Sequence, residues 1–299
     1  MAAITTSSFA KALYPGVNKF YGKGYNEHTE EFSKLFEVSS MSRAFIEDVS
    51  VSSFGLASQR TEGAATTYDS EQQGFITRYT PAEYALGFVI TRNMFDDDLY
   101  DIVGERRAKG LAFSMRQTVE TVAANVYNRA FTSGYTGGDG SILAVSSHAN
   151  IAGGTWSNVL GTAADLSEAS LEQARIDLMK FTNDRGMKIA VMPQSLIVPV
   201  DLITEAEKIL KTPTTPFSAE LTVNVIKGIF PKGLIVNHYL TDVDAWFIRT
   251  NAPDGMKFMW RKEPVFSTDN DFDTDNAKFK AVMRFVAGWS DPRALFASA

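Results

Sequence analysis

The feature that most limits the possible folds is a proline-free segment from Tyr100 to Phe131. Apolar residues in its second half recur at steps of three or four, which places them on one face of a helix: Met115, Val119, Val122, Val126 and Ala130. At about 1.5 Å per residue, such a helix spans roughly 48 Å. We expect Gly134 and the glycine-rich run at 137–140 to end it. This length favours a structural spine over a helix inside a compact enzyme.

A second constraint is the polar stretch from Ser52 to Gln73, which has few large apolar residues and could not bury a core of its own. Short alternating pieces flank it, with valines at 49 and 51 before it and Phe75, Thr77 and Tyr79 after it. This pattern predicts two strands of a long hairpin with a polar tip near residues 61–63. A disordered loop is the alternative. Loops longer than about 15 residues are usually functional or disordered.

The remaining sequence predicts an α+β protein. Phe32, Leu35 and Phe36 have the spacing of a short amphipathic helix within residues 1–49, which we expect to form an extended N-terminal arm. A capping-box pattern at 170–173 predicts a helix that ends before Gly186. Beyond it we expect strands at 189–192, 196–199, 234–239, 245–249, 256–260 and 279–287, and a short helix at 201–210.

The composition excludes several classes of site. The chain has no cysteine, which excludes disulfide scaffolds, thiolate metal sites and cysteine nucleophiles. Its three histidines, His28, His148 and His238, are far apart in the sequence, and no phosphate-loop, dinucleotide, serine-nucleophile or zinc-protease motif is present. We therefore expect no cofactor, no metal and no enzymatic activity. The net charge of −6 disfavours a dedicated nucleic-acid-binding protein.

Neither a membrane span nor a secretory signal is visible. A spanning helix needs about 20 mostly apolar residues, and no stretch of the chain provides them. The first residues lack the basic start and apolar block of a signal peptide. We expect a soluble protein that contacts no membrane.

Two acidic runs were considered as cation sites. In a calcium loop that begins at Asp269, the glycine position holds Thr274 and the final glutamate position holds Lys280, so a solvated turn is the better interpretation. Asp96, Asp97 and Asp98 could chelate a hard cation. Their place before the long helix favours a cap on its free N–H groups instead.

Several short segments follow one another in an order that resembles a known family. They are Gly87–Thr91 before Asp96–Tyr100, Thr118–Glu120 and Ala123–Phe131 in the long helix, and then Gly186–Ile189, Pro193–Pro199 and Asp242–Ile248. With the polar hairpin and the returning C-terminal strand, residues 50–295 resemble the major capsid protein of tailed phages, in particular the Mu-like major head subunit family.

The resemblance implies a Hong Kong 97-type fold. Its parts would be an N-terminal arm (1–49), an E-loop hairpin (50–80), a peripheral domain with the spine helix (81–149), an axial domain (150–250) and return strands of the peripheral domain (251–299). Many copies would form hexamers and pentamers of an icosahedral shell around double-stranded phage DNA. The protein would reside in the virion capsid after assembly in the bacterial host cytoplasm.

The resemblance also implies partners. These are a separate scaffolding protein, the portal, decoration proteins, and packaged DNA that is contacted nonspecifically. Some relatives cross-link an E-loop lysine to a neighbour, but this chain has no lysine between Lys34 and Lys109. We therefore expect a non-covalent shell. Residues 1–50 lack a long charged helical block, so we expect no fused scaffold and no self-cleavage.

Three charged residues of the hairpin, Arg60, Glu62 and Arg78, are candidates for contacts between subunits. The alternative is that they only keep the loop solvated. Two other functions stay open at this point. One is an encapsulin-like compartment that encloses enzymes, and the other is a soluble enzyme or carbohydrate-binding protein.

Overall fold

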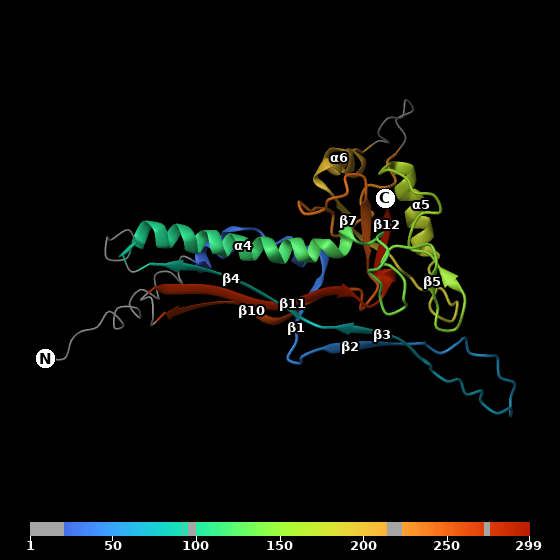
Figure 1. The fold of residues 1–299 in the computed structure, drawn as a ribbon. Coiled ribbons are helices and arrows are strands. Elements are labelled where there is room, and N and C mark those ends of the chain that lie inside the picture. Colours follow the sequence, from blue (N-terminus) through green and yellow to red (C-terminus); the bar gives the residue numbers. More distant parts are fainter. Residues whose placement is uncertain (1–20, 92, 95–99, 214–222, 272–275) are drawn as a thin grey trace.

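The computed structural model describes residues 21–91, 93–94, 100–213, 223–271 and 276–299. Figure 1 shows an elongated part built from one long helix on a sheet, a second block at one end of it, and a hairpin that projects beyond both. The expected acidic cap at Asp96–Asp98 lies outside the described residues. No helix in the described ranges is long and apolar enough to cross a membrane.

The elongated part is organised by helix α4 (Tyr100–Asn128), which confirms the predicted spine. It has 29 residues and ends three positions before the expected Phe131. Its length is therefore about 44 Å. Of the predicted stripe, Met115, Val119 and Ala130 are buried, whereas Val122 and Val126 are partly buried and pack against the same core. Packing of this face against the main core stabilises the helix.

The sheet under α4 has the strand order β1-β10-β11-β4. Its strands are β1 (Glu37–Ser40), β10 (Met256–Asn270), β11 (Ala277–Trp289) and β4 (Ala82–Ile90). The predicted alternation in β11 is confirmed, because Phe279, Ala281, Met283 and Phe285 are all buried. The register of β10 against β11 shifts between Trp260 and Val265, next to a proline that cannot donate to the ladder.

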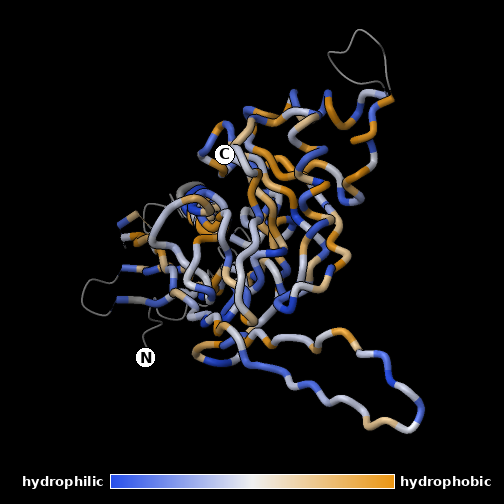
Figure 2. The backbone as a smooth tube through the Cα atoms, turned by 90° about the vertical axis from the view of Figure 1, so that its right-hand side faces the viewer, coloured by the Kyte–Doolittle hydropathy of each residue, from blue (hydrophilic) through white to orange (hydrophobic). Residues whose placement is uncertain are grey.

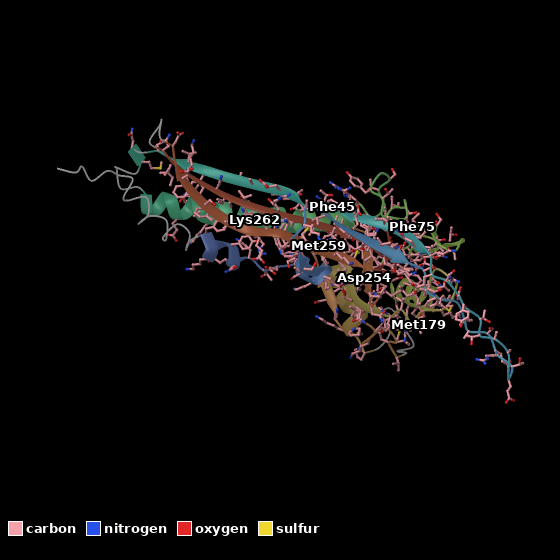
Figure 3. The ribbon with its side chains drawn as sticks, turned by 90° about the horizontal axis from the view of Figure 1, so that it is seen from below. Phe45, Phe75, Met179, Asp254, Met259 and Lys262 are labelled. Atoms are coloured by element: carbon pink, nitrogen blue, oxygen red, sulfur yellow. The ribbon has the colours of Figure 1, made fainter. Side chains whose placement is uncertain are left out.

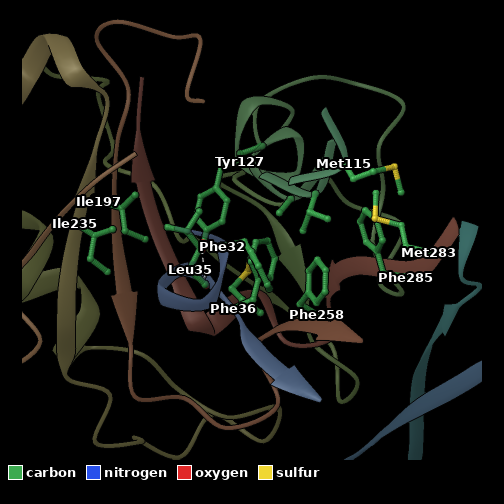
Figure 4. Close-up of a cluster of buried hydrophobic side chains, with 14 of the residues drawn as sticks. Phe32, Leu35, Phe36, Met115, Tyr127, Ile197, Ile235, Phe258, Met283 and Phe285 are labelled. Atoms are coloured by element: carbon green, nitrogen blue, oxygen red, sulfur yellow. Dashed lines mark hydrogen bonds between the residues drawn. The ribbon is translucent and has the colours of Figure 1, made fainter. Parts of the chain in front are cut away.

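The expected N-terminal arm is described from residue 21, and the part around residues 32–40 does not extend freely. Helix α2 (Phe32–Leu35) confirms the predicted helical turn, and Phe32, Leu35 and Phe36 are all buried in the main core. Figure 4 shows these side chains between Tyr127 and Phe258. β1 then pairs with β10 in parallel. Burying Phe32 and Phe36 in this core removes their apolar surface from water, and that stabilises the folded chain more than an exposed arm would.

The second block contains a sheet of order β12-β9-β7-β8. Its strands are β12 (Leu295–Ser298), β9 (Trp246–Thr250), β7 (Pro193–Val198) and β8 (Leu234–Val236), and its helices are α5 (Glu168–Met179), the single turn η2 (Val200–Leu202) and α6 (Ile203–Lys211). The strand predicted at residues 189–192 does not form. β7 begins instead at Pro193, and proline, which has no N–H to donate, is tolerated as the first residue of a strand. A short two-stranded sheet, β5 (His148–Ala149) with β6 (Thr155–Trp156), lies between the two parts in the sequence.

Two expectations about this block were wrong. The capping box of α5 uses Ser167 as N-cap and Ser170 three residues later, so the helix begins earlier than the 170–173 pattern predicted. The end of the chain does not return wholly to the first sheet. β12 pairs with β9 in the second sheet, because its apolar residues are buried on both faces: Leu295 contacts the main core and Phe296 the second core.

The hairpin joins the first sheet with almost no linker. β2 (Ile46–Val51) pairs with β3 (Gln73–Tyr79), and only Thr80 and Pro81 separate β3 from β4. β4 in turn pairs antiparallel with β11 along its whole length. The hairpin therefore continues directly from a strand of the main sheet, as Figure 1 shows.

Candidate assembly surfaces

The predicted hairpin is confirmed, with its first strand starting at Ile46 rather than residue 50. Past Val51 the tip, residues 52–72, contains no strand, yet contacts across it continue the same register. The Ser52 N–H donates to Gln72 O at 2.9 Å, and the Ser58 and Thr67 hydroxyls lie 3.3 Å apart. The chain turns at Gly63, whose φ of 80° is the left-handed conformation that suits glycine.

The structure does not bring the three predicted charged residues together. Arg60 donates from Nη1 to Thr66 Oγ1 at 3.2 Å within the tip, and Glu62 is exposed beside the turn. Arg78 lies in the stem, the β2–β3 pair. Its guanidinium lies 3.9 Å from the centre of the Phe45 ring and, at Nη1, 3.9 Å from Glu47 Oε1. An exposed pair of this kind contributes about 1 kcal/mol or less. A contact of these residues with another subunit stays a prediction.

Sequence reasoning missed several exposed apolar side chains on the hairpin. Val49 and Ile76 lie opposite each other and are 45% and 47% exposed. Further out, Leu56 and Tyr68 are 86% and 92% exposed. Figure 2 shows isolated hydrophobic positions along a mostly hydrophilic hairpin. These few apolar residues are visible in the sequence, but the surrounding segment is so polar that they indicated no exposed apolar surface. A two-stranded sheet is marginally stable alone, and Val49 and Ile76 form an exposed apolar pair on this one.

The base of the hairpin is fixed to the first sheet by an anchor of polar side chains. Tyr79 is buried, and its hydroxyl lies 2.6 Å from Ser290 Oγ, which donates to Asp48 Oδ2 at 2.7 Å. Lys257 Nζ lies 2.6 Å from the same Asp48 oxygen and 2.9 Å from Asp254 Oδ1. Burial acts to raise the pKa of Asp48, but the hydrogen bonds from Lys257 and Ser290 outweigh it and lower that pKa.

A second attachment, which we call the clasp, holds the tip to the loop at 182–188. Arg185 Nη1 lies 3.2 and 3.1 Å from the two Asp69 carboxylate oxygens, and its Nη2 donates to Ser70 O. Asn183 Nδ2 donates to Ser53 Oγ at 2.7 Å. Backbone hydrogen bonds from Gly55 and Ser70, and then Arg185, lower the pKa of Asp69.

Between the anchor and the clasp, the stem borders a pocket of about 540 Å³. Asp48 and Phe75 line it from the hairpin, and Trp156, Asp291 and Arg293 line it from the body. Figure 3, seen from below, shows Phe45 and Phe75 along the stem and Asp254 on the neighbouring body. Burial raises the pKa of Asp291, with Arg293 acting against that rise.

The three histidines lie apart, and each has a structural partner. His148 is fully buried, with Nδ1 2.6 Å from Asp139 Oδ2 and its ring stacked on Trp156. His238 Nδ1 lies 2.6 Å from Glu31 Oε1, and His28 packs against Phe113. In the part of the chain that the structure describes, no group of three or more His, Cys, Asp or Glu side chains could hold a metal ion.

Known proteins share this sequence pattern and this fold. A family model described as phage capsid protein matches residues 74–298. No match to the sequence of a curated protein was found. The fold is similar to the capsid of a native GTA particle, with a TM-score of 0.54, 14% identity and 90% of each chain covered.

Two further solved structures share the fold. The virus-like particle from Pyrococcus furiosus has a TM-score of 0.53 and 13% identity, with 96% of this chain and 99% of that chain covered. The procapsid of bacteriophage JBD30 has a TM-score of 0.51 and 12% identity, with 99% of this chain and 76% of that chain covered. At these identities the likeness concerns the fold alone.

Proposed function

We propose, because the chain belongs to the phage capsid protein family, that it is the major subunit of an icosahedral phage head. Copies of it form hexamers and pentamers that enclose double-stranded DNA. The protein acts as a structural subunit rather than an enzyme. Its place is the virion capsid, after assembly in the host cytoplasm.

The observation that carries this proposal is the hairpin. It projects beyond both sheets and exposes apolar side chains such as Leu56 and Tyr68. Its stem has only two strands, and its tip has no core. A segment of this kind gains its stability against a neighbouring subunit, where its apolar face is removed from water.

The fold supports a Hong Kong 97-type assignment of the parts. The hairpin at 46–79 corresponds to the E-loop, and α4 with the β1-β10-β11-β4 sheet corresponds to the peripheral domain. The β12-β9-β7-β8 sheet with α5 and α6 corresponds to the axial domain. Residues 295–298 belong to this axial part rather than to the peripheral return strands.

The fastening of the shell follows from the distribution of lysines. Between Lys34 and Lys109 the chain has no lysine, so the hairpin supplies no amine for an isopeptide bond. Subunits then associate through non-covalent contacts, in which Arg60 and Glu62 take part. A separate scaffolding protein, a portal and decoration proteins complete the assembly. With a net charge of −6, the wall contacts packaged DNA weakly and without sequence preference.

Electron microscopy of the purified protein, with and without its phage partners, tests the proposal. We expect shells of hexamers and pentamers whose mature form protects DNA from nuclease. Particles that hold protein cargo and no DNA would favour a protein compartment instead. A monomer or small oligomer at every concentration, measured by light scattering, would indicate a soluble enzyme or binding protein and contradict the proposal.

A further inference from the structure

We propose that Arg185 and Asn183 are positioning residues, which hold the hairpin in the orientation from which it meets a second copy of this chain. This inference rests on the proposed assembly role of the hairpin. The loop at 182–188 of the second block would thus fix the direction of the hairpin tip.

The clasp is centred on the Asp69 carboxylate. The Asp69 carboxylate accepts hydrogen bonds from the Gly55 N–H at 2.8 Å and from the Ser70 N–H at 2.9 Å, so it ties together the two sides of the tip. Arg185 binds both oxygens of the same carboxylate. Both of these contacts come from Nη1, while Nη2 donates to Ser70 O, so two nitrogens of one planar guanidinium hold the tip. One side chain thus sets the shape of the tip, and Arg185 sets its angle.

Internal hydrogen bonds fix the shape of the loop that carries Arg185. Asn183 N donates to Met187 O at 2.8 Å, and Asn183 Oδ1 accepts from Arg185 N at 3.0 Å and from Met187 N at 2.9 Å. The loop is fixed to the body because Arg293, which is buried, donates from Nε to Thr182 O at 3.0 Å. The clasp therefore joins the tip to a firm support.

The clasp leaves the apolar side chains of the hairpin exposed. Its contacts involve polar atoms of Ser53, Asp69 and Ser70, whereas Ile76, Leu56 and Tyr68 keep about half or more of their surface exposed. The clasp thus holds the tip while leaving these apolar side chains exposed. Holding a binding segment in its bound orientation lowers the entropic cost of association.

The test measures the lowest concentration at which particles form. Arg185→Ala should raise it about three- to tenfold, since the tip loses its orienting contacts. Lys188→Ala removes the same charge from the same loop at an exposed side chain and should leave it unchanged. The thermal unfolding midpoint should be the same for both variants, because the clasp lies outside the two cores.

A cross-link tests the orientation directly. The chain has no cysteine, so Ser53→Cys with Asn183→Cys can be joined selectively by a short bismaleimide. We expect the joined protein to assemble at or below the wild-type concentration. Failure of the joined protein, when each single-cysteine variant treated alike assembles, would overturn the inference. So would equal assembly of Arg185→Ala and wild type. Absence of particles from wild type and all variants would instead overturn the proposed function, and the inference with it.

Discussion

The Oε2 atom of Glu120 accepts a hydrogen bond from the backbone N–H of Phe32 at 2.8 Å, across 88 positions of sequence. Its Oε1 atom accepts from the Glu31 N–H at 3.0 Å. Glu120 is 1% exposed and lies in the middle of the long helix α4. One buried carboxylate thus caps the start of α2 and holds the N-terminal segment on the spine.

This cap predicts a large effect of truncation. Glu120→Ala leaves the buried Phe32 N–H and the partly buried Glu31 N–H without an acceptor, so the free energy of unfolding should fall by about 2–4 kcal/mol. Glu120→Gln keeps an acceptor oxygen and should cost less. Urea denaturation measures both. Equal stability of Glu120→Ala and wild type would contradict the assignment of Glu120 as the cap.

The same residue predicts a pH dependence. Burial raises the pKa of Glu120 above its ordinary value of 4.5, although the two backbone hydrogen bonds act against that rise. The folded state therefore binds the proton more tightly than the unfolded state. The stability of wild type relative to Glu120→Gln should be greatest below pH 4.5 and decrease as the pH rises through the raised pKa. Denaturation of both proteins from pH 4 to pH 8 checks this slope.

The anchor predicts the opposite slope. The pKa of Asp48 lies below its ordinary value of 3.8, so its contribution is present above that pH and is lost as the pH falls through the lowered pKa. Asp48→Asn should cost about 1–3 kcal/mol at pH 7. Protease cleavage within the tip should also become faster. A stability difference that stays constant down to pH 2.5 would contradict this account.

Two glycines predict opposite effects of the same substitution. A Cβ at Gly87 in β4 would lie 2.5 Å from the backbone oxygen of Phe279, so Gly87→Ala should destabilise the protein by about 1–3 kcal/mol. A Cβ at Gly110 in α4 would meet nothing within 4 Å, so Gly110→Ala should stabilise it by about 0.5–1 kcal/mol. The thermal unfolding midpoints of the two variants test this contrast. An equal change of the midpoint in both variants would contradict it.

The apolar face of the stem predicts an effect on assembly without an effect on folding. Val49→Ser with Ile76→Ser should leave the unfolding midpoint within a few degrees of wild type, because both side chains are about half exposed. Particle yield should fall strongly, since the proposed contact surface becomes polar. Ile176→Ser on α5, equally exposed, serves as the control. Unchanged yield in the double variant would argue against this face as a contact.

Periodicity predicted the elements whose signal is local. The steps of three and four in α4, and the alternation from Phe279 to Phe285 in β11, record one-sided burial directly in the sequence. The pairing of β2 with β3 was likewise predicted from short alternating runs on either side of a polar tip.

Contacts between distant segments left no such signal. The parallel pairing of β1 with β10 joins residues more than 200 positions apart, and the transfer of β12 to the second sheet depends on space beside β9. The clasp joins Asp69 to Arg185 across 116 positions. Neither residue differs from an ordinary surface charge until the fold brings them together.

The two-residue link between β3 and β4 has a mechanical consequence. A pull on the hairpin tip is transmitted through Thr80 and Pro81 along the axis of β4, parallel to its ladder with β11. Tension then acts in shear on all the hydrogen bonds from Ala82 to Ile90 at once, rather than opening them one after another. Force that reaches the chain through its hairpin is thus spread over the main sheet.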